Sequence, residues 1–297
     1  MADKQTYTFT NEINTVEVSS LGAKIIMMPQ ERADIYVEYD NPKDSPEFCA
    51  VLSGKTLTLK ESFSFSIFGN KPADGYTNSV FLPLRTYEKI KLNTASGGVE
   101  VGEVSAENFS LNTASGNISV NAFFNNVKLQ SASGNITLTN PLAGRSPEVF
   151  LDKGEQAPAV HKAQSMNVCT VSGNATVSGY RAEEFGIHSV SGTTNVDGIC
   201  GRGSVSVTSG TVNLGYADWD NDLNVSLISG NVNISLPEGS GADLTISGVS
   251  GSVRTDLGQT KGNFMNLGKG TNGAFGGENK HKLNASLTSG TVTIAQK

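Results

Sequence analysis

The sequence predicts an all-β protein, a single-chain parallel β-solenoid (β-helix) with coils of about 19 residues. Three observations predict it: a Ser-Gly pair recurs between residues 96 and 290, apolar and polar residues alternate around it, and no comparable stretch shows the helical period. The pairs begin at Ser96, Ser115, Ser133, Ser172, Ser191, Ser209, Ser229, Ser250 and Ser289. Their spacings are 19, 18, 39, 19, 18, 20, 21 and 39 residues, so each 39 is close to two periods.

Residues 1–88 are rich in strand-like segments but lack the Ser-Gly period. Such segments occur at residues 16–18, 25–27, 35–39, 57–59 and 80–82. An open sheet edge at the start of a stack of coils invites aggregation, so repeat proteins cover it. We therefore expect residues 1–88 to form an N-terminal β cap that is continuous with the solenoid of residues 89–297.

Each repeat, numbered from its Ser, holds two short strands that meet at the Ser-Gly pair. Around Ser115, the apolar residues are Phe109 and Leu111 at positions −6 and −4, and Ile118 and Val120 at +3 and +5. Small polar residues fill the positions between, so each strand has one buried face. Because so small a unit cannot bury that face alone, successive coils must stack with their strands parallel. The usual crossover rule predicts a right-handed coil.

The Gly of each pair marks a corner of the coil. Only Gly accepts positive φ or a close approach of two backbones without steric cost. Just before the corner the alternation becomes ambiguous, because position −2 is Thr, Ser, Val, Leu or Gly and position −1 is Ala, Val, Ile or Thr. The sequence leaves open which of these two positions points inward.

Two segments break the period, near residues 140–165 and near residues 256–281. The first contains three prolines and several charges, and the second contains seven glycines. We expect irregular loops there, where function often lies in a compact stack. The final strand, residues 291–295, ends the chain, so we expect it to leave a weakly guarded sheet edge that permits end-to-end self-association.

Composition narrows the classes of partner and location. The net charge is −6 and there is no basic cluster, which argues against nucleic acid or an anionic membrane as the main partner. Cys49, Cys169 and Cys200 are odd in number and widely spaced, which fits neither a disulfide framework nor a metal site. No apolar run approaches the ~18 residues of a transmembrane helix. The opening residues lack a secretory signal, which leaves open a cytoplasmic protein or a cell-surface protein whose leader was removed.

Three aromatic residues are candidates for a contact surface. Phe63 and Phe65 share one face of a short strand, which either faces the core of the cap or forms an exposed apolar patch. Trp219, the only Trp, is either an anchor for its loop or a surface on which a sugar stacks. In each case the buried alternative is the stronger one.

The sequence supplies no metal, cofactor or catalytic site. Asp218–Asp222 is faintly like a calcium loop, but Leu223 and Ser229 stand where that loop needs Gly and Glu. A serine that recurs in every coil, outside a Gly-x-Ser-x-Gly setting, predicts a structural ladder rather than a nucleophile. A polysaccharide lyase or hydrolase would need acids stacked on neighbouring coils. In the outward +4 column the one acid is Glu100 and the one base is Arg254, at opposite ends, so an enzyme could use only the irregular loops.

The repeated phrases at residues 92–101, 111–120 and 129–138, together with residues 234–251, resemble the bacterial putative-adhesin domain family, a domain of unknown function. The resemblance covers residues 10–297. It implies a solenoid of parallel strands, an adhesin-like label and, in some relatives, a link to the cell envelope and its stress response. It implies no catalytic or binding residues, and the present chain departs from it in showing no export signal.

These observations favour a non-enzymatic, adhesin-like solenoid that binds a protein or glycan at the cell envelope or serves there as a structural protein. A regulatory scaffold for envelope stress, acting through protein contacts, is the first alternative. A β-helical carbohydrate-active enzyme is the second. Stacked carboxylates in a cleft would favour the enzyme, an apolar patch the scaffold, and a shallow polar groove with aromatic residues a glycan adhesin.

Overall fold

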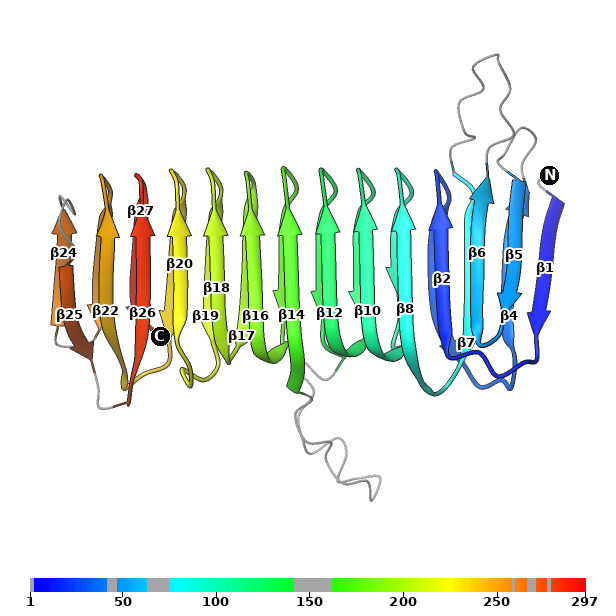
Figure 1. Ribbon diagram of the computed structural model, residues 1–297, viewed down its shortest axis with the longest axis horizontal. Helices are drawn as coiled ribbons and strands as arrows, with labels where there is room; N and C mark the ends of the chain where they lie inside the picture. The colour runs from blue at the N-terminus through cyan, green and yellow to red at the C-terminus, as the bar shows by residue number, and fades with distance from the viewer. Residues whose placement is uncertain are drawn as a thin grey trace, which may run out of the picture. The chain divides into compact units, whose positions relative to one another are not determined.

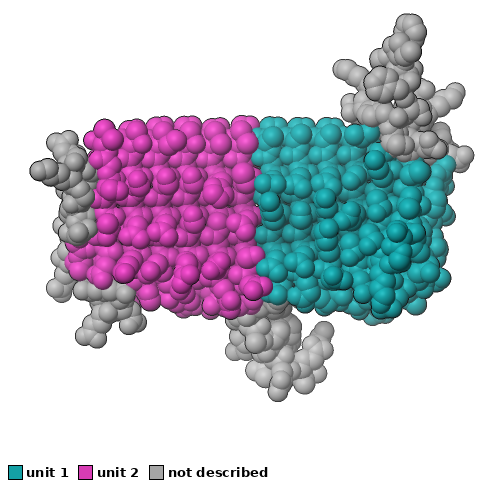
Figure 2. Space-filling view, viewed as in Figure 1, with its two compact units in different colours: residues 1–141 teal, residues 142–297 magenta. Residues whose placement is uncertain are grey.

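The computed structural model describes residues 3–41, 47–62, 75–141, 162–257, 260–265, 271–276 and 279–297. Every regular element among these residues is a β-strand, which confirms the predicted all-β class. The chain divides into two compact units, unit 1 (residues 1–141) and unit 2 (residues 142–297), shown in Figure 2. Each unit is a pair of mostly parallel sheets, with strands lying side by side in each sheet (Figure 1).

Unit 1 begins with longer strands and continues with the repeats. In unit 1, sheet A has the strand order β1-β4-β7-β3-β9-β11-β13 and sheet B has the order β5-β6-β2-β8-β10-β12. Pairing is parallel among the repeats and antiparallel between β1 and β4, β4 and β7, and β5 and β6. The strands are β1 (Asp3–Phe9), β2 (Thr15–Ser20), β3 (Lys24–Gln30), β4 (Ile35–Asn41), β5 (Glu47–Ser53), β6 (Thr56–Ser62), β7 (Thr77–Pro83), β8 (Thr86–Thr94), β9 (Val99–Val101), β10 (Ser105–Thr113), β11 (Ile118–Asn121), β12 (Phe123–Ser131) and β13 (Ile136–Thr139).

Unit 2 has the same two-sheet plan. Its sheet A has the order β15-β17-β19-β21-β27-β23-β24 and its sheet B the order β14-β16-β18-β20-β26-β22-β25. The strands are β14 (Lys162–Thr170), β15 (Ala175–Ser178), β16 (Arg181–Ser189), β17 (Thr193–Ile199), β18 (Arg202–Val207), β19 (Thr211–Tyr216), β20 (Leu223–Leu227), β21 (Asn231–Leu236), β22 (Ser240–Gly248), β23 (Ser252–Leu257), β24 (Thr260–Met265), β25 (Thr271–Gly276), β26 (Asn279–Leu287) and β27 (Thr291–Gln296).

The apolar positions of the repeat form the core between the two sheets. Leu111 in β10 lies between Leu92 and Leu129 of the neighbouring strands, and Ile118 in β11 pairs with Ile136. All five side chains are almost completely buried. Full burial of such a side chain contributes about 1.5–3 kcal/mol, so the stacked ladders supply much of the stability. The predicted inward phase and parallel register are confirmed.

The corner of each coil places position −2 inside and position −1 outside. At the corner that follows β10, Thr113 is 7% exposed and its hydroxyl accepts a hydrogen bond from the backbone N–H of Gly116, whereas Ala114 is exposed. The Gly backbones stack closely: a Cβ on Gly116 would lie 1.9 Å from the carbonyl oxygen of Gly97. At Gly290 the corner also needs φ of +106°. Close approach is therefore the main reason for Gly, and positive φ an added one at some corners.

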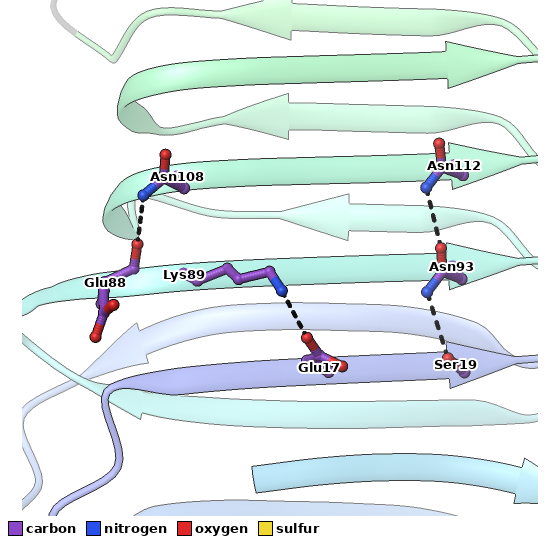
Figure 3. Close-up of polar contacts among 7 residues, drawn as sticks. All are labelled: Glu17, Ser19, Glu88, Lys89, Asn93, Asn108 and Asn112. Carbon is purple, nitrogen blue, oxygen red and sulfur yellow. Dashed lines mark hydrogen bonds and ion pairs between the residues drawn. The ribbon is translucent and has the colours of Figure 1, made fainter. Parts of the chain in front are cut away.

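Polar side chains on the outer faces form ladders between coils. In unit 1, the Asn112 amide donates to Asn93 Oδ1 at 3.0 Å, and Asn93 donates to Ser19 Oγ at 3.4 Å (Figure 3). On the same sheet, Lys89 Nζ lies 2.8 Å from Glu17 Oε1. These bonds tie each coil to the next while leaving the side chains partly in solvent.

In each unit, a coil from one end of the chain is inserted into the stack. In unit 1, β2 lies between β6 and β8, and β3 lies between β7 and β9. In unit 2, β26 lies between β20 and β22, and β27 lies between β21 and β23. Strand β27 contains residues 291–295, so the expectation that these residues leave an open edge for end-to-end association is wrong.

The outer strands of unit 2 come from the segment near residues 256–281. Strand β24 pairs antiparallel with β23, and β25 pairs antiparallel with β22. The segment therefore contains regular strands, where the sequence indicates an irregular loop. Of the other such segment, near residues 140–165, residues 142–161 lie outside the described part of the chain.

Candidate binding groove

A shallow groove lies on the outer face of sheet B in unit 2. Its volume is about 550 Å³ and it opens broadly to solvent. It crosses five strands, β16, β18, β20, β26 and β22, which are adjacent in that order. The groove is lined by His188, Ser204, Val205, Ser206, Asn224, Val225, Ser226, Thr245, Ser247, Asn284, Ala285 and Ser286.

The polar groups of the groove come from positions −5 and −3 of successive repeats. Parallel register aligns each position into a column that runs from coil to coil. The −5 column is Gly186, Ser204, Asn224, Asn284 and Thr245, and the −3 column is His188, Ser206, Ser226, Ser286 and Ser247. Hydroxyl and amide groups both donate and accept hydrogen bonds, so the floor offers many uncharged hydrogen-bonding groups. His188 is the one ionisable side chain among its lining residues.

An apolar ridge borders these columns at position −1. We define the ridge as Val171, Val190, Ile228 and Val249. In the order of the strands, Thr208 lies between Val190 and Ile228, and Thr288 lies between Ile228 and Val249. The four aliphatic side chains are 46%, 44%, 53% and 80% exposed, respectively. Position −1 follows position −3 by two residues, so both project from the same side of the sheet. Val190, Ile228 and Val249 therefore follow three of the five groove strands, and Val171 follows β14, one strand beyond the groove.

The equivalent columns of unit 1 are chemically different. Position −5 there includes Glu17, Lys91 and Lys128, and position −1 is Ala in the three repeats that begin at Ser96, Ser115 and Ser133. A hollow of about 400 Å³ on sheet A of unit 1 carries the Lys24–Glu100 ion pair, at 2.7 Å. An uncharged groove with an aliphatic border thus distinguishes the repeats of unit 2.

Trp219 is buried in unit 2, with an exposed fraction of 6%. Its indole Nε1 donates to the carbonyl oxygen of Gly241 at 2.8 Å, and its ring meets Tyr216 edge-on at 4.9 Å between centroids. His281 meets the same ring edge-on at 6.1 Å. With its ring packed and its N–H bonded, Trp219 anchors the loop that follows β19 and offers no open face for a sugar.

The acidic run Asp218–Asp222 around Trp219 is used to hold neighbouring segments. The three carboxylates accept hydrogen bonds from different groups and do not converge. The bonds are Asp218 Oδ2 from Arg181 Nη1 at 2.7 Å, Asp220 Oδ1 from the Gly201 N–H at 2.7 Å, and Asp222 Oδ1 from the Lys282 N–H at 2.8 Å. Within the described part of the chain, no cluster of three His, Cys, Asp or Glu side chains could hold a metal ion.

Phe63 and Phe65 lie outside the described residues, but the buried carboxylate that precedes them is described. Glu61 is 3% exposed. Its Oε2 accepts from Ser20 Oγ at 3.0 Å, the Leu21 N–H at 2.7 Å and Tyr76 Oη at 3.1 Å, and its Oε1 accepts from Asn78 Nδ2 at 2.5 Å. Burial, reinforced by the Glu61 charge, raises the pKa of Tyr76 well above its usual value. Glu61 thus fastens β6 to β7 and to the turn after β2.

Replacing this carboxylate by an apolar side chain of similar size should be costly. Glu61→Leu leaves the donors of Leu21, Tyr76 and Asn78 without this acceptor, whereas the Ser20 hydroxyl keeps the Ala23 carbonyl. We expect a loss of about 2–4 kcal/mol in the free energy of unfolding. Urea denaturation followed by circular dichroism measures it. Glu100→Leu, which removes only the exposed ion pair with Lys24, should cost under ~1 kcal/mol. Equal losses in the two variants would contradict the assigned role of Glu61.

The Ser-Gly serines form the structural ladder that the sequence indicates. Seven of the nine hydroxyls donate to a carbonyl oxygen of the neighbouring coil, at 3.0–3.3 Å; the acceptor is the −1 residue, or Leu21 for Ser96. The bonded serines are Ser96, Ser115, Ser133, Ser191, Ser209, Ser229 and Ser289.

The family model described as Toastrack DUF4097 matches residues 13–295. The chain belongs to the Toastrack DUF4097 family. A search of curated proteins finds no match. No helix of the described Toastrack chain is long and apolar enough to cross a membrane.

Chains of solved structures are similar to this one, and the first of those that follow shows the same fold. A putative adhesin from Parabacteroides distasonis ATCC 8503 is 12% identical, with 99% of this chain and 97% of that chain covered and a TM-score of 0.55. A putative adhesin from Bacteroides fragilis NCTC 9343 is 13% identical, with 98% and 97% covered and a TM-score of 0.44. A putative lipid binding protein from P. distasonis ATCC 8503 is 15% identical, with 99% and 97% covered and a TM-score of 0.48.

Sequence reasoning did not find the groove or the ridge of this Toastrack protein. Acids and bases in the outward columns are the signal of a catalytic site, whereas the informative feature here is a run of positions without charge. The signal that could have found the site is the change at position −1 from Ala in the first three repeats to Val or Ile at Val171, Val190, Ile228 and Val249.

Proposed function

We propose that this Toastrack protein is a non-enzymatic, adhesin-like protein of the cell envelope whose groove in unit 2 binds an uncharged glycan. The observation that carries the proposal is the row of Ser, Thr and Asn side chains along the groove, whose lining contains no Asp, Glu, Lys or Arg. The adhesin name of the P. distasonis relative agrees with it.

The chemistry of the groove suits a neutral polyhydroxyl ligand. Sugar hydroxyls donate and accept hydrogen bonds, as do the Ser, Thr and Asn groups of the floor. A charged polymer would find no counter-charge on the floor of the groove, because the groups there are mainly hydroxyls and amides. The groove is open and lacks aromatic lining residues other than the imidazole of His188, so each sugar would bind weakly and affinity would come from many contacts along a polymer.

A single glutamate at the groove floor tests this assignment. Ser204 is exposed and lies between Gly186 and Asn224 on the neighbouring strands. We expect Ser204→Glu to lower the affinity for a neutral polysaccharide at least tenfold, because the longer charged side chain occupies the floor. Titration calorimetry with the polysaccharides selected on a glycan array measures the change.

Ser110→Glu is the matched control for this variant. Ser110 holds the same −5 position in unit 1, between Lys91 and Lys128. It should fold and bind as the parent protein does. If Ser204→Glu binds normally, or if no neutral glycan binds the parent protein, the proposed ligand is wrong.

The proposed location at the cell envelope is tested separately, by protease treatment of intact source cells. Protection of the protein from the protease would oppose an adhesive role.

A further inference from the structure

We infer that the groove and the ridge together hold one extended, β-linked, uncharged glycan chain that lies along the stack, with one sugar unit per coil. This inference rests on the proposed glycan-binding function and adds to it the direction, the length and the linkage class of the ligand. Three features of unit 2 carry it: the spacing of the columns, the aliphatic border, and the alternating charges of the opposite border.

The direction follows from the way equivalent groups repeat. Ser206, Ser226 and Ser286 occupy the same position in adjacent parallel strands. Adjacent strands are about 4.8 Å apart, so an identical hydroxyl recurs at that interval along the stack. One pyranose unit of an extended β-linked chain has nearly this length. A chain that lies across the strands therefore meets a serine hydroxyl of the −3 column on four of the five strands, with His188 on the fifth.

A peptide strand fits the groove less well. Strands β18, β20 and β26 are paired with a neighbour on both sides, so their backbone groups are already used in the sheet. Recognition by added β-strands needs free N–H and C=O groups at a sheet edge. The groove presents only side chains, which favours a ligand that carries its own hydroxyl groups.

The ridge supplies the apolar half of the site. A pyranose ring has an apolar face of C–H groups and a rim of hydroxyls, so it needs a surface with both characters. Val190 and Ile228 are 44% and 53% exposed and border the hydroxyl columns. Contact with the C–H faces of the sugars would remove these aliphatic side chains from water, which is favourable.

The opposite border of the groove, at position −7, carries charges that alternate in sign. The series across adjacent strands is Glu184, Arg202, Asp222, Lys282 and Asp243. Arg202 Nη1 lies 3.8 Å from Glu184 Oε1, and the Lys282 N–H bonds Asp222 Oδ1. Three acids and two bases give this border a net charge of −1, and because the signs alternate it has no cluster of one sign that would bind a charged polymer.

The extent of the groove sets the length of chain that it binds. The lining residues come from five adjacent strands, so five sugars span them at one sugar per coil. In unit 1 the corresponding positions carry Lys91 and Lys128 at −5 and Ala95 and Ala114 at −1, so the combination of neutral floor and aliphatic border is not repeated there.

The length of the bound chain is measured with two series of defined oligosaccharides, β-1,4-linked glucose and β-1,4-linked N-acetylglucosamine, from two sugars upward. We expect the association constant of one or both to rise at least tenfold between the dimer and the pentamer and then to level off. Polymer binding with no dependence on length beyond two sugars would overturn this inference and leave the proposed function standing. Failure of every neutral polysaccharide to bind would overturn both.

The ridge is tested by the double variant Val190→Ser/Ile228→Ser, whose side chains are exposed and need not support the fold. Its affinity for the longest oligosaccharide bound should fall at least fivefold. The control is Val51→Ser/Leu84→Ser, which removes exposed aliphatic side chains, 54% and 62% exposed, from unit 1 and should bind normally. A ridge variant that keeps full glycan affinity but loses binding to neutral phosphatidylcholine vesicles would overturn the inference and make the ridge a lipid contact.

Discussion

Replacing Gly97 by Ala should lower the free energy of unfolding by about 4 kcal/mol or more, which is exceptionally large for a single substitution. A Cβ on Gly97 would lie 1.8 Å from the carbonyl oxygen of Ala23 and 2.7 Å from its carbonyl carbon. Both are backbone atoms, and Ala23 is fully buried, so neither can move aside alone. The two coils would have to separate at the corner, which stretches the hydrogen bonds between neighbouring strands and opens the core beside them.

The adjacent Gly98 is the control for this prediction. A Cβ there would meet its nearest atom, the carbonyl oxygen of Asn117, at 3.5 Å, an ordinary contact distance. Gly98→Ala should therefore change the free energy of unfolding by under ~1 kcal/mol, partly because Ala restricts the unfolded chain. Urea denaturation of both variants measures the difference. Similar stabilities of the two would mean that the coils are not stacked as closely as the structure has them.

The repeat itself was predictable because two simple rules agree at every coil. Alternation places residues such as Leu111 and Ile118 on one face, and a unit of about 19 residues cannot bury that face without neighbours of the same kind. A shift by one residue would turn every apolar side chain to solvent, so the register is strongly determined. Which of the two corner positions faces the core was not predictable, because Thr113 and Ala114 both suit a bend and neither hydropathy nor size decides between them.

The order of coils could not be predicted from the period. Any coil fits on any other, because all have the same strands, and the chain gives no sign that residues 279–297 return to an internal place. A weak signal exists in the charges at position −7. In the observed order Lys282 lies between Asp222 and Asp243, whereas a stack in chain order would place the two aspartates side by side. Like charges directly opposite each other are unfavourable, so the alternation supports the inserted order.

The candidate site shows the same division between what is local and what depends on the whole stack. The burial of Trp219 depends on Gly241 and Tyr216, which local sequence cannot bring together. The groove is a property of five adjacent coils, one of which, β26, reaches it only through the insertion. Without the correct coil order, Asn284 and Ser286 would not be assigned to the groove at all.

Removing residues 279–297 should abolish cooperative folding of unit 2. The deletion takes β26 and β27 from the middle of the two sheets and exposes a strand edge on each side of the gap. It also removes the completely buried Leu283, Val292 and Ile294. Each is worth about 1.5–3 kcal/mol, and their sum is comparable with the whole stability of an ordinary domain, about 5–15 kcal/mol. Thermal unfolding followed by circular dichroism should show a lost or strongly broadened transition.

Two further measurements separate insertion of this coil from general damage by truncation. Removing only Gln296 and Lys297 should leave the unfolding transition in place. This shorter deletion removes the Gln296 side-chain bond to the Ser240 carbonyl, the backbone bond from Lys297 to Leu236, and the exposed ion pair of Lys297 with Asp197. A synthetic peptide of residues 279–297 should restore a sharp transition when added to the shortened protein, because it fits a gap lined by strands on both sides. If the shortened protein unfolds as the intact protein does, the coil lies at an edge and not within the stack.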